Sequence, residues 1–302
     1  MKKSMLLASF LFGAVSIAQT EASHSGHDLA EPHFCNQVKM ENQLWKAHPE
    51  WKEAYDESQA EFQAHMDSNP ESGTGDRAIK VIPIVFHVVH LGGVENISDE
   101  QIYDAIDNLN VDFSMTNDDL GSTVSAFAGI TGNTEFEFRL AKKDPSGQCH
   151  PGITRTYSST TYDVGMGSSG HPIVEAVKSA HGTWPMEKYM NVYVCIDPAG
   201  AAGYTFKPAG YMNPYTDDMY WGIFLRHDYC GTIGTSSSGR RHTLSHEAGH
   251  WFNLNHPWGN SNSPGDPDNC DINDGVGDTP NTIGWSFCDL DGTSCGSLDN
   301  VQ

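Results

Sequence analysis

The stretch His-Glu-Ala-Gly-His-Trp-Phe-Asn-Leu-Asn-His, residues 246–256, constrains this chain more than any other. On a helix, His246 and His250 leave the same face one turn apart, so both imidazoles can bind one ion. His256 can join them only if the helix ends and the chain turns back. Asn253 suits that turn because, after Gly, Asn adopts the left-handed conformation most readily, and Pro257 prevents further helix.

Three imidazoles and one open position are typical of a catalytic zinc site. Glu247 directly follows the first ligand, which places its carboxylate where it can take a proton from a metal-bound water. The pattern therefore predicts Zn²⁺ held by the three histidines, with Glu247 as the general base of a hydrolase. His242 is a rival ligand one turn earlier, but three histidines along a straight helix cannot converge on one ion. We therefore expect His242 either to support the metal ligands from outside the coordination sphere or to face solvent.

The spacing of these histidines resembles that of the metzincin clan. The wider strings at 243–251 and 274–280 are similar to those of the pappalysin (ulilysin-like) secreted metalloendopeptidases, as are 152–155, 189–194 and 231–235. The resemblance extends over residues 78–302. It implies an α+β fold, namely a metzincin-like zincin catalytic domain with a mixed twisted sheet plus an active-site helix, and it implies protein or peptide substrates.

Two departures from the family pattern are visible. Asn253 replaces a Gly of the metzincins, which its conformational preference allows. The family also carries a methionine-containing turn under the zinc ion, after the third His, whereas the last methionine here is Met219. We therefore expect that the sequence is truncated at Gln302, before that turn.

The N-terminus predicts export. Lys2 and Lys3 precede an apolar run from Met5 to Ile17, which is too short to span a bilayer, so residues 1–18 read as a secretory signal peptide and the protein as extracellular. No later stretch is long and apolar enough for a membrane span. The formal charge of −22 argues against nucleic acid and anionic membranes as partners.

Residues 19–77 differ in composition and end in a linker rich in Pro, Gly and Ser, with Arg77 as a suitable processing site. Pro49 divides them into two helical segments, and the second carries an apolar stripe of Trp51, Tyr55, Phe62 and Met66 that can dock on another surface. We interpret 19–77 as a short helical propeptide and 78–302 as the catalytic domain.

Cys35 is the only cysteine of the predicted propeptide. A thiolate is a better zinc ligand than water, and pappalysin-like zymogens are thought to use such a cysteine. The resemblance therefore implies that Cys35 occupies the fourth zinc position and that the propeptide inhibits its own enzyme. The alternative is a structural disulfide between Cys35 and a cysteine of the catalytic domain.

Within residues 78–302, apolar patterning predicts four strands and two helices. Ser98 and Gln101 are predicted to form a capping box, and Pro83 confines the start of its strand to an edge or bulge. We expect the strand nearest the zinc helix to be a sheet edge. The strands are expected at 81–90, 136–140, 190–196 and 221–225, and the helices at 98–113 and 173–180.

Eight aspartates and no Lys or Arg follow His256. A hard cation would relieve their repulsion, so we predict Ca²⁺ with Asp271, Asp274, Asp278 and Thr279 as candidate ligands, partly because the family's calcium sites lie in this loop. A solvated acidic loop is the alternative.

The resemblance also implies a Cys270–Cys295 disulfide and leaves Cys288 without its partner. Pairing of Cys149, Cys195 and Cys230 stays open, with Cys195–Cys230 as a guess. These features favour a secreted zinc metalloendopeptidase made as a zymogen. The alternatives are a non-catalytic secreted binding domain stabilised by zinc or calcium, and a zinc amidase.

Overall fold

The computed structural model describes residues 33–68, 78–285 and 292–297, except 124, 126, 130, 164, 166–169, 209–218 and 278. The predicted signal peptide, Arg77, Asp278 and Cys288 lie outside the described residues. The described residues all belong to one unit, Pro32–Gln302. No helix within them is long and apolar enough to cross a membrane.

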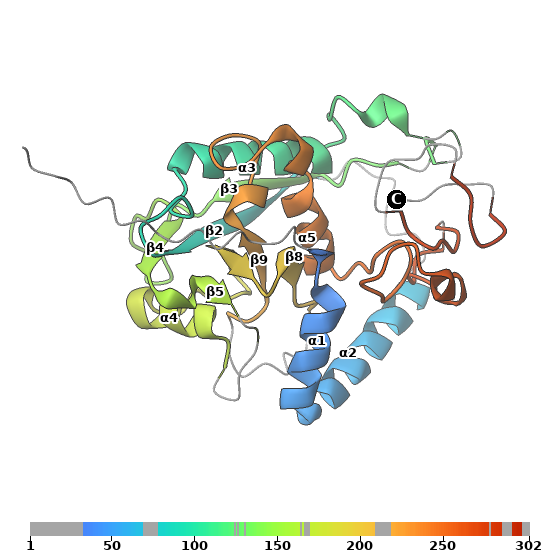
Figure 1. Cartoon of the computed structure of the whole chain (residues 1–302), viewed down its shortest axis with the longest axis horizontal. Coiled ribbons are helices and arrows are strands. Elements are labelled where there is room, and N and C mark those ends of the chain that lie inside the picture. The colour runs from blue at the N-terminus through green and yellow to red at the C-terminus, as the bar shows by residue number, and fades with distance from the viewer. Residues whose placement is uncertain are drawn as a thin grey trace, which may run out of the picture. The chain divides into compact units, whose positions relative to one another are not determined.

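A seven-stranded sheet is the centre of this unit (Figure 1). Its strands follow the order β1-β8-β9-β6-β2-β3, with β4 also paired to β2, and every pairing is parallel except that of β8 with β9. The strands are β1 (His33–Cys35), β2 (Lys80–His90), β3 (Phe136–Leu140), β4 (Ile153–Tyr157), β6 (Met190–Cys195), β8 (Ala201–Thr205) and β9 (Gly222–Arg226). A separate pair joins β5 (Tyr162–Asp163) to β7 (Asp197–Pro198).

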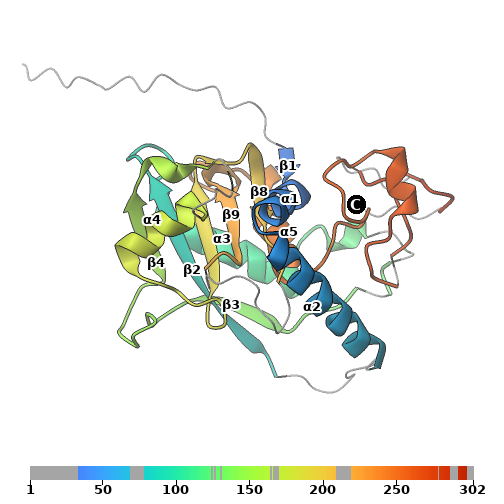
Figure 2. The same ribbon diagram turned by 90° about the horizontal axis from the view of Figure 1, so that it is seen from below.

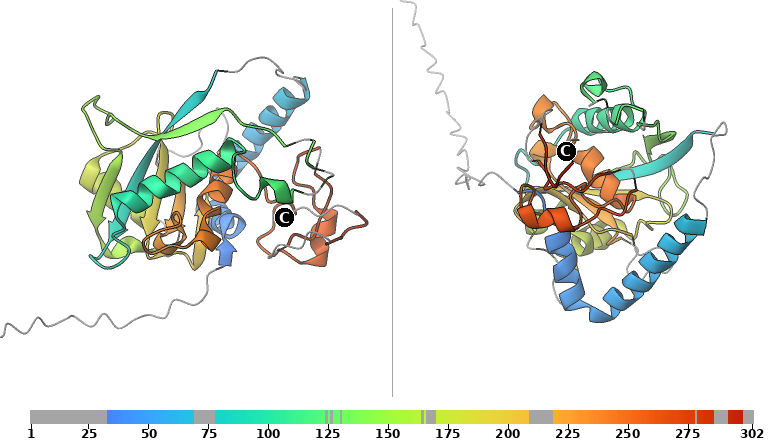
Figure 3. Two further views of the ribbon diagram at one scale, coloured as in Figure 1. Left: turned by 90° about the horizontal axis from the view of Figure 1, so that it is seen from above. Right: turned by 90° about the vertical axis from the view of Figure 1, so that its right-hand side faces the viewer.

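Helices cover both faces of the sheet (Figures 2 and 3). The α-helices are α1 (Gln37–Ala47), α2 (Pro49–Ser68), α3 (Asp99–Phe113), α4 (Pro172–His181) and α5 (Thr243–Trp251). Five short 3₁₀ turns are described: η1 (Leu120–Ser122), η2 (Ser159–Thr161), η3 (His227–Tyr229), η4 (Ser238–Arg240) and η5 (Pro267–Asp271).

The side chains of each strand divide between two core clusters because successive residues point to opposite faces. In β2, Phe86 and Val88 pack with residues of α3 and α5, whereas Val85 and Val89 pack with residues of α1, α2 and α4. The zinc-motif helix α5 is therefore held against one face through Leu244 and Ala248.

Most of the predicted elements are present, with ends shifted by one or two residues. Pro83 lies where β2 has β3 on one side, since pairing with β6 begins only at Ile84, as expected for a residue without a backbone donor. Ser98 does cap α3 by accepting a bond from the Gln101 backbone. The second half of the capping box is wrong, because Oε1 of Gln101 accepts the backbone N–H of Thr235 over 3.1 Å instead of that of Ser98.

The expectation that the strand before the zinc helix is a sheet edge is also wrong. β9 lies between β6 and β8, and the sequence reading missed β8, which lies outside it. The missed segment is Ala-Ala-Gly-Tyr-Thr, which is poor in the β-branched residues that mark strands. β1 then pairs with the outer side of β8.

The N-terminal helices are built as the sequence suggested, but only part of the apolar stripe packs. Trp51 and Tyr55 of α2 join the buried cluster, whereas Phe62 and Met66 are 41% and 49% exposed. α1 supplies two further buried residues, Met40 and Leu44. The two helices therefore complete the core beside β8.

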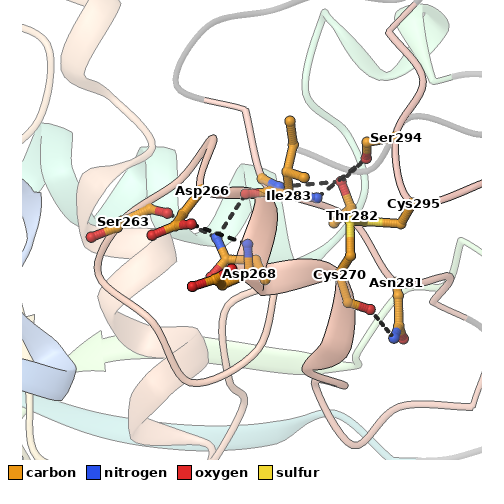
Figure 4. Close-up of a disulfide and its surroundings, with 11 residues drawn as sticks. Ser263, Asp266, Asp268, Cys270, Asn281, Thr282, Ile283, Ser294 and Cys295 are labelled. Atoms are coloured by element: carbon orange, nitrogen blue, oxygen red, sulfur yellow. Dashed lines mark hydrogen bonds between the residues drawn. A yellow bond between two sulfur atoms is a disulfide. The ribbon is translucent and has the colours of Figure 1, made fainter.

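The Cys270–Cys295 disulfide implied by the family resemblance is present (Figure 4). Around it, Asn281 donates to the Cys270 carbonyl over 2.8 Å, and the hydroxyls of Thr282 and Ser294 lie 3.1 Å apart. The guessed Cys195–Cys230 pair is wrong, because both side chains are buried thiols. Cys149 is an exposed thiol.

Candidate metal centre

The end of α5 brings the third histidine back to the first two. The backbone N–H groups of Asn253 and Leu254 bond to the carbonyls of His250 and Gly249, and Asn253 has a φ of 74°. This is the left-handed conformation expected for Asn253. The chain then reverses, so that His256 faces the helix.

The three imidazoles converge on one point. Nε2 of His250 lies 3.2 Å from Nε2 of His246 and 3.2 Å from Nε2 of His256. Two nitrogens bound at ~2.0–2.1 Å to a tetrahedral zinc ion are separated by about 3.3 Å. The spacing and chemistry of these donors therefore fit a zinc ion.

A sulfur atom completes the group. Sγ of Cys35 lies 3.6 Å from Nε2 of His250, and the ligand atoms of Cys35 and the three histidines all lie within 4.8 Å of one another. With Zn–S at ~2.3 Å, a tetrahedral site requires about 3.6 Å between sulfur and nitrogen. Cys35 is thus in the place of a fourth ligand.

Neighbouring groups fix the orientation and charge state of the imidazoles. Nδ1 of His250 is 2.8 Å from the carbonyl of Leu254, and the ring of His256 stacks on Trp258 with 4.6 Å between centroids. Burial lowers the pKa of His246 to about 4 and that of His256 to about 3. Burial also lowers the pKa of His250 well below its usual value. The rings are therefore neutral at pH 7, which is the form that binds metal.

Glu247 is fully buried beside this cluster. Its Oε2 accepts a hydrogen bond from Thr205 of β8 over 2.9 Å. Burial raises the pKa of Glu247 to about 8, although the bonds from Thr205 and Cys35 lower it. Gly203 makes room for this carboxylate, since a Cβ there would lie 2.9 Å from Oε1.

Cys35 reaches the site because its segment lies along the sheet edge. β1 pairs with β8 in parallel, with Cys35 opposite Gly203, and Asn36 donates to the Gly203 carbonyl. The alternative of a Cys35 disulfide is wrong, because Cys35 is a free, buried thiol. Burial, and then the charge of Glu247, raise the pKa of this thiol well above its usual value.

Other predicted site residues lie elsewhere. His242 is directed at Asp112, with 2.8 Å between Nδ1 and Oδ2, so it is not part of the histidine cluster. Within the described part of the chain, the Cys35 cluster is the only group of three or more His, Cys, Asp or Glu side chains placed to share an ion. Asp271 is exposed, Asp274 is buried and Thr279 is half-buried, and no described contact joins them as a calcium site.

Sequence reasoning missed three residues at the site, namely Thr205, Lys207 and Glu41. Thr205 holds Glu247, while Glu41 of α1 and Lys207 form a buried ion pair. Thr205 belongs to the unrecognised strand. Lys207 could have been noticed, because it is the only cation between Lys188 and Arg226.

Comparison with known proteins agrees with this geometry. The sequence profile of the peptidase family described as pregnancy-associated plasma protein-A matches residues 175–299. A mutant of promirolysin from Tannerella forsythia superposes with a TM-score of 0.63 and 31% identity over 82% of this chain and 76% of that one. Mature mirolysin in complex with a cleaved peptide, from the same organism, superposes with a TM-score of 0.61. It is 32% identical in sequence, and the match covers 75% of this chain and 80% of that one.

A curated relative, an extracellular metalloprotease of Sordaria macrospora, is 27% identical over 151 residues. The alignment covers 49% of this chain and 50% of that protein, so the chain spans about half the length of the curated relative.

The mixed sheet with its helices and N-terminal propeptide region defines a metallopeptidase of the metzincin class. The chain belongs to the pappalysin family of these enzymes. Both the family and the fold class predicted from sequence are thereby confirmed.

Proposed function

We propose that the protein is a secreted, zinc-dependent metalloendopeptidase made as a zymogen. The observation that carries this proposal is the convergence of three neutral imidazoles beside a buried carboxylate. In this proposal, His246, His250 and His256 hold the zinc ion. When bound, zinc supplies an acidified water and polarises the carbonyl that is attacked.

Glu247 is proposed as the general base. Its carboxylate takes a proton as water attacks the scissile carbonyl, and it then passes that proton to the leaving amine. Thr205 supports this role because its hydroxyl fixes Oε2 of the carboxyl, which also interacts with Cys35 of the cluster.

Strand β8, whose outer side is covered in the described structure only by β1, is proposed as the place where a substrate peptide binds once β1 has left. An exposed sheet edge can pair with an extended peptide through its backbone. In the precursor, β1 pairs with this edge and Cys35 lies at the cluster. The presence of a cleaved peptide on mature mirolysin supports a peptide as substrate.

We propose that residues 19–77 form a propeptide that keeps the enzyme latent and is removed by processing at Arg77. In this proposal, residues 1–18 are the signal peptide and residues 78–302 are the catalytic domain. Cys35 blocks the fourth zinc position until the propeptide leaves. The 3.6 Å between its sulfur and His250 supports this role. We further propose that Ca²⁺ binds Asp271, Asp274, Asp278 and Thr279.

The test measures zinc content and hydrolysis of casein and of an internally quenched peptide. We expect one zinc per chain, activity that phenanthroline abolishes, and loss of activity in Glu247→Ala with zinc retained. Glu187→Ala, an exposed glutamate remote in sequence from the motif, is the matched control and keeps its activity.

The two alternatives give other results. A zinc-stabilised binding domain would hold zinc and cut nothing. A zinc amidase would cleave small amide substrates but neither casein nor an internal peptide bond. Either result would refute the proposed endopeptidase.

A further inference from the structure

Lys207 is a buried cation beside the histidine cluster. It lies two residues after β8 and is 5% exposed. Its Nζ donates to Oδ1 of Asn255 over 2.6 Å, and Asn255 immediately precedes His256. Burial and the neighbouring imidazoles lower the pKa of His250 and His256 most, and the positive charge of Lys207 adds a smaller contribution of the same sign. The ammonium is therefore part of the site's electrostatics.

Glu41 of the N-terminal segment pairs with this cation. Its Oε1 accepts the backbone N–H of Lys207 over 3.0 Å, and its Oε2 is 3.9 Å from Nζ. Glu41 is 3% exposed, so its carboxylate has left water almost completely. A carboxylate is retained in such a place only where donors compensate it. Lys207 thus offers this carboxyl one backbone donor and a nearby positive charge, and both lower its pKa against the larger effect of burial, which raises it.

The same segment covers the cluster and Lys207 at once. Cys35 lies opposite Gly203 on β8, and six residues later Glu41 reaches the residue that follows this strand. A peptide that binds along β8 and presents a carbonyl to the cluster must pass over the surface that Cys35 and Glu41 cover here. Loss of the segment leaves Lys207 without the Glu41 carboxylate.

We propose that Lys207 is a specificity-determining residue that binds an Asp or Glu side chain at one fixed position of the substrate. Glu41 occupies this place in the precursor. The inference rests on the proposed peptidase function, because it assigns a substrate class to that site. It runs against the overall charge of −22, which would repel an acidic peptide elsewhere on the protein.

The test uses the full chain, matured by processing and loaded with zinc. Peptide sets place Glu, Gln or Lys at each position around one scissile bond, and kcat/KM is measured for each. The readout is the ratio of kcat/KM for the Glu peptide to that for the Gln peptide. This ratio is measured on one enzyme sample, so incomplete folding or zinc loading cancels.

In the wild type we expect Glu to be favoured over Gln about tenfold or more at one position, the range of a charge-assisted hydrogen bond. Lys207→Met should bring the ratio close to one, and Lys207→Glu should favour the Lys peptide at that position. Lys188→Met, a change at an exposed lysine, is the matched control and should keep the wild-type ratio.

Equal rates for the Glu and Gln peptides at every position would overturn the inference, as would a Glu preference that Lys207→Met leaves intact. If neither Lys207 variant folds, the wild-type scan decides alone through the presence or absence of the Glu preference. Wild-type protein that cleaves no peptide would refute the proposed function, and the inference with it. Cleavage without an acidic preference refutes only the inference.

Discussion

The sulfur of Cys35 lies 3.6 Å from Nε2 of His250, although 215 residues separate the two in the chain. This contact is within hydrogen-bonding distance for sulfur but is not an ion pair, since Cys35 is an uncharged thiol and His250 is neutral. A zinc ion would hold the two together by binding both. It would also offset the burial that keeps Cys35 protonated, because a metal-bound thiol loses its proton.

If the proposed latency mechanism holds, replacing Cys35 should release the precursor from latency. We expect Cys35→Ala to hydrolyse a quenched peptide before processing and to mature early at Arg77, because water can then take the fourth position. Cys149→Ala, which removes an exposed thiol, is the control and should stay latent. Combining Cys35→Ala with Glu247→Ala should keep the chain intact unless another protease cuts it. A Cys35→Ala precursor as latent as the wild type would rule out the switch.

Substitutions at Asn253 test whether the turn that brings His256 to the cluster needs a left-handed backbone conformation. Its φ of 74° strains a β-branched residue but not Gly. Asn253→Val should cost about 1–3 kcal/mol and weaken zinc binding, whereas Asn253→Gly should keep zinc affinity. Zinc affinity and melting temperature are measured for both variants. Equal zinc affinity in Val and Gly variants would show that the turn does not need this conformation.

The Asn253→Gly variant should still differ from the wild type in one respect. The Asn253 amide donates to Gln59 of α2 over 2.9 Å, and the Gln59 amide donates to the carbonyl of Pro208. A Gly therefore keeps the turn but removes a contact with the N-terminal segment. We expect faster processing of this precursor, measured on gels over time. Gln59→Ala should have the same effect, and unchanged processing in both would contradict it.

The cluster of His246, His250 and His256 could be predicted from sequence because the three histidines lie within eleven residues on one helix and its turn. Local spacing sets that geometry. Thr205 and Lys207 could not be predicted in the same way, since they reach Glu247 and Asn255 only through the pairing of β8 with β9. Strand pairing between distant segments leaves little trace in a short Ala- and Gly-containing stretch.

The role of Gln101 shows a different limit. Its position three residues after Ser98 fits a capping box, and the Ser98 cap is present. The Gln101 amide nevertheless bonds the 227–235 segment, since its Nε2 donates to the carbonyls of His227 and Cys230 at 2.9 Å and its Oε1 accepts the backbone N–H of Thr235. A long-range demand of buried backbone groups outweighs the local motif.

His87 should make stability depend on pH independently of the metal site. It is fully buried between Thr154 and Asn191, and burial lowers its pKa to about 3. Below about pH 6.5 this histidine is protonated in the unfolded chain but stays neutral in the folded chain. Its contribution to the free energy of unfolding is therefore complete above pH 6.5 and is lost as the pH falls towards 3. The wild type should lose up to about 1.4 kcal/mol per pH unit from this group.

The measurement is urea unfolding between pH 7 and 4 for the wild type and for His87→Gln. The variant lacks the titrating group but keeps hydrogen-bonding capacity towards Thr154 and Asn191, so its curve should fall less steeply. His90→Gln, at a more exposed position of the same strand, is the control and should follow the wild type. Parallel pH curves for His87→Gln and the wild type would exclude His87 as the source.

The last prediction concerns calcium binding by the aspartates that follow His256. This acidic segment is hydrogen-bonded to Asn255, the residue that precedes His256. The backbone carbonyl of Asp274 accepts a bond from the Asn255 side chain over 3.0 Å. The side-chain Oδ1 of Asp274 accepts a bond from the backbone N–H of Val276. Calcium at a hundred times its dissociation constant would stabilise the fold by about 2.7 kcal/mol, which corresponds to a rise in melting temperature of about 5 °C. Asp274→Asn should remove most of that rise, whereas Asp268→Asn, a change at an exposed aspartate outside the proposed ligand set, should keep it.

The melting temperature is measured in EDTA-treated, zinc-reloaded protein with and without millimolar Ca²⁺. An identical melting temperature in both conditions would mean that the aspartates form a solvated loop, since mutual repulsion alone does not require a bound ion.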